Sequence, residues 1–243
     1  GAMAYGTNSI PKVDKIYGPG NQYVTKAKEI IQQQGVAIDL PAGPSEILVV
    51  ADDTAKPDFI AADLLSQAEH GTDSQAMLVC TNEAIVKEVN SQLNKQLNKL
   101  PRKKIIEKAL QNSKAIVLKN TDLCIDFSNY YAPEHLIIAT KSSENEAQKI
   151  VNAGSVFLGN YSCESAGDYA TGTNHTLPTN GYAKNYSGVS LDSFTKKITF
   201  QKISKKGLLN IGETVELMAQ AEQLEAHKNA VSIRLKSIYN EQT

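Results

Sequence analysis

Apolar runs of strand length alternate along the chain with longer stretches in which apolar positions recur every three or four residues. The short runs are apolar at consecutive positions, which is typical of strands covered on both faces. We predict strands at 36–40, 47–51, 76–80, 115–118, 136–139 and 156–158, and helices at 22–34, 58–70, 83–100, 102–112 and 144–152. This alternation predicts an α/β fold with a largely parallel sheet flanked by helices.

The pattern changes after residue 160. Residues 161–190 are rich in Gly, Thr, Asn and Ser and show little periodicity. An irregular segment of this length inside a compact protein is usually functional. A short apolar run at 198–200 and a helical pattern over 212–239 follow, which predicts a small C-terminal helical module.

Composition excludes several classes of function. The chain has 243 residues and a formal net charge of −1, so it lacks the electrostatic footprint of a nucleic-acid or anionic-membrane partner. No apolar run approaches the ~20 residues that a bilayer span needs. The three cysteines, Cys80, Cys124 and Cys163, are odd in number and widely spaced, which indicates a reducing compartment. These features predict a soluble cytoplasmic protein.

Glu134 and His135 stand side by side after Pro133 and directly before the apolar run 136–139. The pattern fits an acid–base pair held at the start of a strand, because an imidazole beside a carboxylate is suited to proton transfer. It also fits a solvated turn that enters the strand. These residues alone leave both interpretations open.

The segment KPDFIAADLLSQAEHG places Asp63, Gln67 and His70 on one face of a helix. A histidine and an amide three residues apart can converge on one metal ion. Glutamine is an uncommon metal ligand, however, and this segment alone favours a polar stripe on the exposed face of an amphipathic helix.

Two further segments offer carboxylate–imidazole pairs. In SAGDYATGTNH, Asp168 and His175 lie in a flexible segment that fits either a metal site or a surface loop. In AEQLEAHKNA, Glu222 and His227 are five residues apart, roughly 140° around a straight helix. They share a face only if the helix breaks or tilts between them.

Glycine-rich turns supply weaker candidates. YGPGN opens a predicted helix with Asn21 as N-cap, a place that can receive an anion, although it is not a G-x-G-x-x-G motif. DLPAGPSE follows a predicted strand and offers Ser45 as a hydrogen-bonding group. The neighbours of Cys163, Ser162 and Glu164, supply no base or positive charge, so we expect an unreactive thiol.

Seven motifs occur in an order that resembles the histidinol dehydrogenase family, zinc enzymes that complete histidine biosynthesis. They are KIYGPGN, DLPAGPSEILV, DLLSQAEHG, YAPEHL, GSVFLGN, SAGDYATGTNHTLPT and EAHKNAV. The resemblance extends from about residue 4 to the C-terminal helix, and the ordered set is far more specific than any single motif.

The resemblance implies a site shared between the two subunits of a homodimer, with His227 supplied by the partner. It implies the zinc ligands Gln67, His70, Asp168 and His227. It implies the substrate-binding residues Ser45, Gln67, His70, His135, Asp168, His175, Glu222 and His227. For NAD, Asn21 is the one matching residue.

The implied reaction oxidises L-histidinol to L-histidinal and then to L-histidine, with two hydride transfers to NAD. Glu134 would activate water and His135 would move protons. Zinc would chiefly orient the substrate.

The resemblance also implies an organisation into incomplete Rossmann-like domains. Residues 1–44 would be the remainder of one, residues 45–190 the main α/β domain, and residues 191–243 a helical dimerisation module. Family members carry a long N-terminal portion with no counterpart here, so we expect a truncated fragment that is inactive alone. Two alternatives are a zinc-dependent hydrolase and a non-catalytic binding or assembly fragment.

Overall fold

The computed structural model of the chain describes residues 1–18, 20, 22–41 and 43–241. It divides into two compact units, residues 1–194 and residues 195–243.

A five-stranded parallel sheet forms the centre of the first unit, with the strand order β5-β4-β3-β6-β7. Its strands are β3 (Glu46–Ala51), β4 (Gln75–Cys80), β5 (Lys114–Val117), β6 (His135–Ala139) and β7 (Ser155–Leu158). The predicted α/β fold with a largely parallel sheet is confirmed. In chain order the strands run outward from β3 to one edge and then from β6 to the other, as in a doubly wound sheet.

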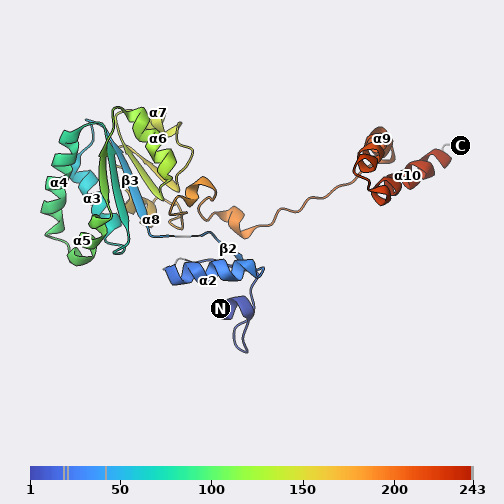
Figure 1. Cartoon of the computed structure of the whole chain (residues 1–243), viewed down its shortest axis with the longest axis horizontal. Coiled ribbons are helices and arrows are strands. Elements are labelled where there is room, and N and C mark those ends of the chain that lie inside the picture. The colour runs from blue at the N-terminus through green and yellow to red at the C-terminus, as the bar shows by residue number, and fades with distance from the viewer. Residues whose placement is uncertain (19, 21, 42, 242–243) are drawn as a thin grey trace. The chain divides into compact units, whose positions relative to one another are not determined.

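Helices cover both faces of this sheet (Figure 1). One face carries α3 (Pro57–Ala68), α4 (Glu83–Leu97) and α5 (Lys103–Gln111), and the other carries α6 (Thr121–Tyr131) and α7 (Ser143–Ala147). Successive side chains of a strand point to opposite faces. Ile47 and Val49 of β3 therefore pack towards α3, while Leu48 and Val50 pack towards α6. Covering both faces explains why the strand is apolar at consecutive positions.

The N-terminal segment forms a smaller layer of its own. It contains α1 (Ala2–Tyr5), β1 (Lys15–Ile16), α2 (Gln22–Gln33) and β2 (Ala37–Ile38), and the two strands pair in parallel. Gly35 adopts a φ of 90° just after α2, in the left-handed region expected of a helix-ending glycine. The sequence pattern did not predict β1, which is too short to show periodicity.

Two elements on the second face of the sheet differ from the sequence prediction. Helix α6 was not predicted, although Asn120 caps it by accepting a hydrogen bond from the Leu123 N–H. Helix α7 ends at Ala147 instead of continuing to residue 152. The side-chain oxygen of Asn129 accepts the Val151 N–H and draws that segment away from helical pairing.

The glycine-rich segment contains more structure than its composition indicated. A short helix, α8 (Glu164–Tyr169), lies inside it, followed by the 3₁₀ turns η1 (Tyr182–Lys184) and η2 (Leu191–Phe194). The remainder is irregular, as predicted. Helix α8 has only six residues, so no periodic apolar pattern reveals it.

The second unit is a pair of helices, α9 (Lys205–Ala221) and α10 (Glu225–Asn240). The prediction of one helical stretch over 212–239 is wrong at its start and in the middle, while its end lies one residue from the end of α10. Ser204 caps α9 seven residues earlier than expected, and the chain breaks at Gln223, whose φ is 61°. Residues 198–200 lie in an extended segment outside any strand. None of the helices described is long and apolar enough to cross a membrane.

Gly154 lies where the backbone before β7 passes closest to Glu134. A Cβ at this position would lie 2.5 Å from the Glu134 carbonyl oxygen and 3.1 Å from Leu177 Cβ. Backbone atoms cannot move aside cheaply, so we expect Gly154→Ala to lower the free energy of unfolding by about 1–3 kcal/mol. Urea denaturation tests this. Gly71→Ala is the control, because its Cβ would meet the mobile end of the Asp73 side chain. Equal stability of the two variants would contradict the prediction.

Candidate active site

Most of the predicted site residues gather at the amino-terminal ends of the parallel strands. Glu46 begins β3, Glu134 directly precedes β6, and His135 pairs with Ile47 on one side and Ser155 on the other. Doubly wound sheets usually bind ligands outside the carboxyl ends of their strands, where the strand order reverses. In this sheet the strand order reverses between β3 and β6. The candidate residues, however, meet at the amino-terminal ends of these strands and not at their carboxyl ends.

Strand alternation aims His135 at the helix α3 side of the sheet. It shares that face with Ile137 and Ala139, which pack in the cluster beneath α3. Its ring is 6.2 Å from that of Phe157, and the residue is only 2% exposed. Glu134 is also buried, at 5% exposure, and its Oε2 accepts the Glu46 N–H at 3.0 Å. The Glu134–His135 pair is therefore part of the interior, and the solvated-turn interpretation is wrong.

Gln67 and His70 lie at the end of α3. The predicted helix to residue 70 ends at Ala68, and the His70 N–H donates to the Gln67 carbonyl at 3.2 Å in the closing turn. Gln67 is completely buried, and neither its side-chain oxygen nor its nitrogen has a hydrogen-bond partner within the described part of the chain. Such a buried amide is costly unless it meets a ligand, because its polar atoms have lost their hydration.

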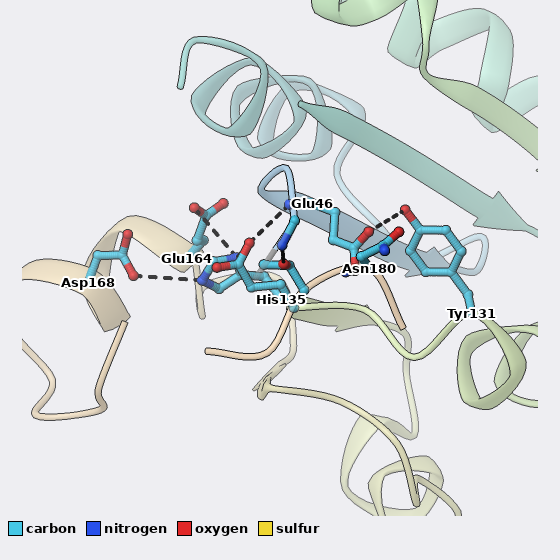
Figure 2. A network of polar contacts seen from close by, with 9 residues as sticks. Glu46, Tyr131, His135, Glu164, Asp168 and Asn180 are labelled. Carbon is cyan, nitrogen blue, oxygen red and sulfur yellow. Dashed lines mark hydrogen bonds and ion pairs between the residues drawn. The ribbon is translucent and has the colours of Figure 1, made fainter. Parts of the chain in front are cut away.

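Helix α8 brings two carboxylates to the same place. Glu164 and Asp168 are one helical turn apart, and their oxygens lie with a His70 ring nitrogen in a group whose ligand atoms are all within 4.8 Å of one another. Asp168 Oδ1 is 3.8 Å from His135 Nε2, and Glu164 Oε1 is 3.9 Å from His135 Nδ1 (Figure 2). Two carboxylates and one imidazole at this spacing match the donor types of a divalent-metal site.

Glu46 links Glu134 to two other elements. Its Oε2 accepts from the Tyr131 hydroxyl at 3.2 Å, and its Oε1 accepts the Asn180 N–H at 2.9 Å, as Figure 2 shows. Its own backbone N–H holds the Glu134 carboxylate. Through these bonds α6 and the chain after His175 are fixed relative to Glu134.

Two adjoining cavities open at this edge of the sheet. The smaller, of about 190 Å³, is bordered by six of the predicted residues, namely Ser45, His70, Glu134, His135, Asp168 and His175. The larger, of about 350 Å³, extends from Ser45 and His70 along Thr25, Lys26 and Glu29 of α2. The pair of cavities offers room for a small ligand beside the histidines and for a second ligand next to α2.

Burial governs the protonation of the central groups. It lowers the pKa of His135 to about 4, so the ring is neutral near pH 7 and can accept a proton. Burial, together with the neighbouring charges of Glu164, Glu46 and Asp168, raises the pKa of Glu134 to about 8. The pKa of Glu164 is likewise raised to about 8, by burial first and then by Asp168 and Asp63. A cation bound among these carboxylates would favour their charged forms.

Two predicted residues lie in the second unit, and a third lies outside the described residues. Glu222 and His227 belong to the second unit, where both are exposed. The break at Gln223 places them on different segments, because Glu222 ends α9 and His227 lies in α10. The predicted NAD residue Asn21 lies outside the described residues.

Glu46, Tyr131 and Glu164 were missed by the sequence analysis. In the sequence, Glu164 stands out only as a neighbour of Cys163. Its signal was the four-residue spacing to Asp168, which puts both carboxylates on one face once the segment is helical. Glu46 had a weaker signal, a carboxylate at the head of a fully apolar strand.

Comparison with known proteins addresses the family of the chain. The family model for histidinol dehydrogenase matches residues 1–235. The chain belongs to the histidinol dehydrogenase family. It is 61% identical to the histidinol dehydrogenase of Bacteroides thetaiotaomicron and 63% identical to that of Bacteroides fragilis, in each case over 98% of this chain. A crystal structure of histidinol dehydrogenase from Elizabethkingia anophelis matches it with a TM-score of 0.96 and 66% identity, again over 98% of this chain.

The chain matches only part of the length of each histidinol dehydrogenase. The chain covers 55% of the length of both Bacteroides proteins and 55% of the Elizabethkingia chain. It therefore spans about half the length of the relatives that it matches.

Proposed function

We propose that this chain carries the metal site and the acid–base pair of a zinc- and NAD-dependent histidinol dehydrogenase, which converts L-histidinol through L-histidinal to L-histidine. Family membership supports the assignment. The structural observation that carries it is the buried Glu134–His135 pair, which opens on one cavity together with His70 and Asp168. Cytoplasmic location is part of the same proposal, as is the homodimer.

The residues present fit a zinc ion. His70 and Asp168 supply a nitrogen and an oxygen close together, and the buried Gln67 amide has polar atoms without a partner among the described residues. We propose Gln67, His70 and Asp168 as ligands from one subunit and His227 as the ligand from its partner. Bound zinc would act as a Lewis acid that orients the substrate's imidazole and amine.

His135 is suited to move the protons of both oxidation steps. In the first step the substrate hydroxyl loses its proton as hydride leaves carbon, and a neutral buried imidazole can accept that proton. In the second step the hydrated aldehyde loses a hydroxyl proton and a hydride in the same way. Bound NAD would supply the hydride acceptor for each step. Each turnover thus converts one alcohol to one carboxylate and reduces two NAD.

Glu134 is suited to activate the water that hydrates the aldehyde. Its carboxylate lines the cavity beside His135 and is held by the Glu46 N–H, so its position does not depend on the substrate. Only the second oxidation needs this water. The carboxylate must be charged to act as a base, and a cation bound at His70 and Asp168 would favour that charged form.

The remaining predicted residues would hold the ligands. Ser45 and His175 border the smaller cavity and can hydrogen-bond the substrate. Glu222 and His227 would reach the site from the partner subunit's second unit. Asn21 would contact NAD, next to Gly20, which borders both cavities.

NADH production from L-histidinol tests the proposal. The protein, at the full length of its relatives and supplied with zinc and NAD, should form two NADH for each histidinol consumed. A zinc hydrolase would release product without reducing NAD, and a binding fragment would do neither. Either result would overturn the assignment. The same assay on residues 1–243 tests the expectation that this chain alone is inactive.

A further inference from the structure

Glu164 is a buried carboxylate for which the proposed reaction names no role. It is 2% exposed, and its Oε2 has no hydrogen-bond partner among the described residues. Its Oε1 lies 3.9 Å from His135 Nδ1. A carboxylate so deep in the interior is costly unless it receives a hydrogen bond from a donor.

The His135 ring lacks a partner in the same way. Neither ring nitrogen has a hydrogen-bond partner within the described ranges, although carboxylates approach both. Nδ1 faces Glu134 Oε2 at 3.7 Å and Glu164 Oε1 at 3.9 Å, and Nε2 faces Asp168 Oδ1 at 3.8 Å. These distances exceed a hydrogen bond but require only a small rotation to close, and catalytic hydrogen bonds often tighten when substrate binds.

A neutral imidazole carries one N–H, and its position decides which nitrogen can act as a base. Nε2 lies beside Asp168, which borders the cavity, so this nitrogen must stay unprotonated to accept a proton from substrate. The N–H then belongs on Nδ1 and needs an acceptor. Glu134 Oε2 already accepts the Glu46 N–H, whereas Glu164 Oε2 has no donor among the described residues.

We propose that Glu164 is a positioning residue that accepts the Nδ1–H of His135 and thereby fixes the tautomer whose Nε2 faces the cavity. Helix α8 then supplies two functional carboxylates. Glu164 positions His135, and Asp168, one turn later, faces the metal site. The tautomer is a property of this chain and can be measured without turnover. Its catalytic consequence rests on the proposed function.

The competing role for Glu164 is metal ligation, since its oxygen belongs to the group formed with His70 and Asp168. The two roles predict different losses. A positioning residue can be removed with the metal retained, whereas removing a ligand weakens metal binding as strongly as removing His70.

Nitrogen-15 NMR of the histidine side chains tests the proposal on the chain itself. The chain has four histidines, so each signal can be assigned by single substitution. After chelator treatment, His135 should show the Nδ1–H tautomer, and Glu164→Met should shift it towards a mixture of the two tautomers. Asp63→Asn is the control, because Asp63 is a carboxyl of the same neighbourhood that no ion pair links to His135, and it should leave the tautomer unchanged.

An unchanged His135 tautomer in folded Glu164→Met would overturn the proposal. So would a loss of zinc affinity equal to that of His70→Ala, measured by competition with a chelating dye. If Glu164→Met does not fold, Glu164→Gln decides. Its amide oxygen can still accept the Nδ1–H, so the tautomer should persist while the Nδ1 signal moves, and an unmoved signal would contradict the proposal.

In an active protein, Glu164→Met should lower kcat for both oxidation steps by roughly 10–100-fold with KM nearly unchanged, the cost usual for a residue that orients another. If NMR shows the expected tautomer but histidinol is not oxidised, the proposed function fails and the positioning role stands.

Discussion

His70→Ala and Asp168→Ala are each expected to remove most of the bound zinc from the protein. Both side chains present donor atoms within the same 4.8 Å group, and the described part of the chain offers few replacements. The zinc dissociation constant should rise by more than the roughly 10–100-fold that changing a residue behind a ligand costs. Elemental analysis after dialysis against a chelator measures the effect.

His175→Ala serves as the control for this experiment. His175 borders the same cavity and is exposed, but it does not belong to the group formed by His70, Glu164 and Asp168. It should therefore keep its zinc. Full zinc content in both ligand variants would refute the assignment. Zinc loss in His175→Ala alone would show that the metal binds near His175 and not at His70 and Asp168.

The sheet could be predicted because burial on both faces leaves a direct trace in the sequence. β3 and β4 are apolar at nearly every position, and so short an apolar run, with β-branched residues in β3, favours a buried strand over a buried helix. Helix α6 left no such trace. Its sequence TDLCIDFSNYY mixes weak helix formers with aromatic residues, so its helical state depends on packing against the sheet and on the cap at Asn120.

The site was only partly visible in the sequence. Local spacing indicated that Gln67 and His70 could act together, and adjacency indicated the Glu134–His135 pair. The meeting of α3, β6 and α8 depends on strand register, because the pairing of His135 with Ile47 and Ser155 decides which helix end the imidazole faces. The spacing of residues along the chain does not reveal that register. The ordered motifs supplied the set of residues, but not their place at the amino-terminal edge.

Glu46 and Tyr131 show why supporting residues are harder to find. Both lie inside motifs of the family resemblance, DLPAGPSEILV and YAPEHL, but neither has a role assigned there, and each gains its role from a partner far along the chain. Burial raises the pKa of both groups, and their hydrogen bond joins two elements that the sequence does not connect. Polar residues of this kind are recognised only when the interior is seen.

His135→Asn is expected to slow both oxidation steps by about 10²–10⁴-fold, the range typical of removing a general base. The asparagine amide keeps a polar group in the buried position but cannot accept a proton near pH 7. The neutral state of His135 follows from burial, which lowers its pKa to about 4. Zinc content and the circular dichroism spectrum should match the parent protein.

Glu134→Gln is expected to separate the two steps. The amide can still face the Glu46 N–H through its oxygen, so the local structure should persist, but it cannot take a proton from water. Oxidation of histidinal should fall by about 10²-fold or more, since only this step needs activated water, while oxidation of histidinol should change by a few-fold at most. Glu144→Gln, at an exposed position in α7, is the matched control and should leave both steps unchanged.

The two half-reactions must be assayed separately, with histidinol and with histidinal as starting substrates. Single-turnover measurement of NADH formation resolves the first hydride transfer from the second. Glu134 Oε2 lies 3.7 Å from His135 Nδ1. A Glu134→Gln variant that slows both steps equally would therefore show that Glu134 assists proton transfer by His135 and does not activate the water. A variant that slows only the alcohol step would reverse the two roles, because the carboxylate would then act on the hydroxyl proton and His135 on the hydrate.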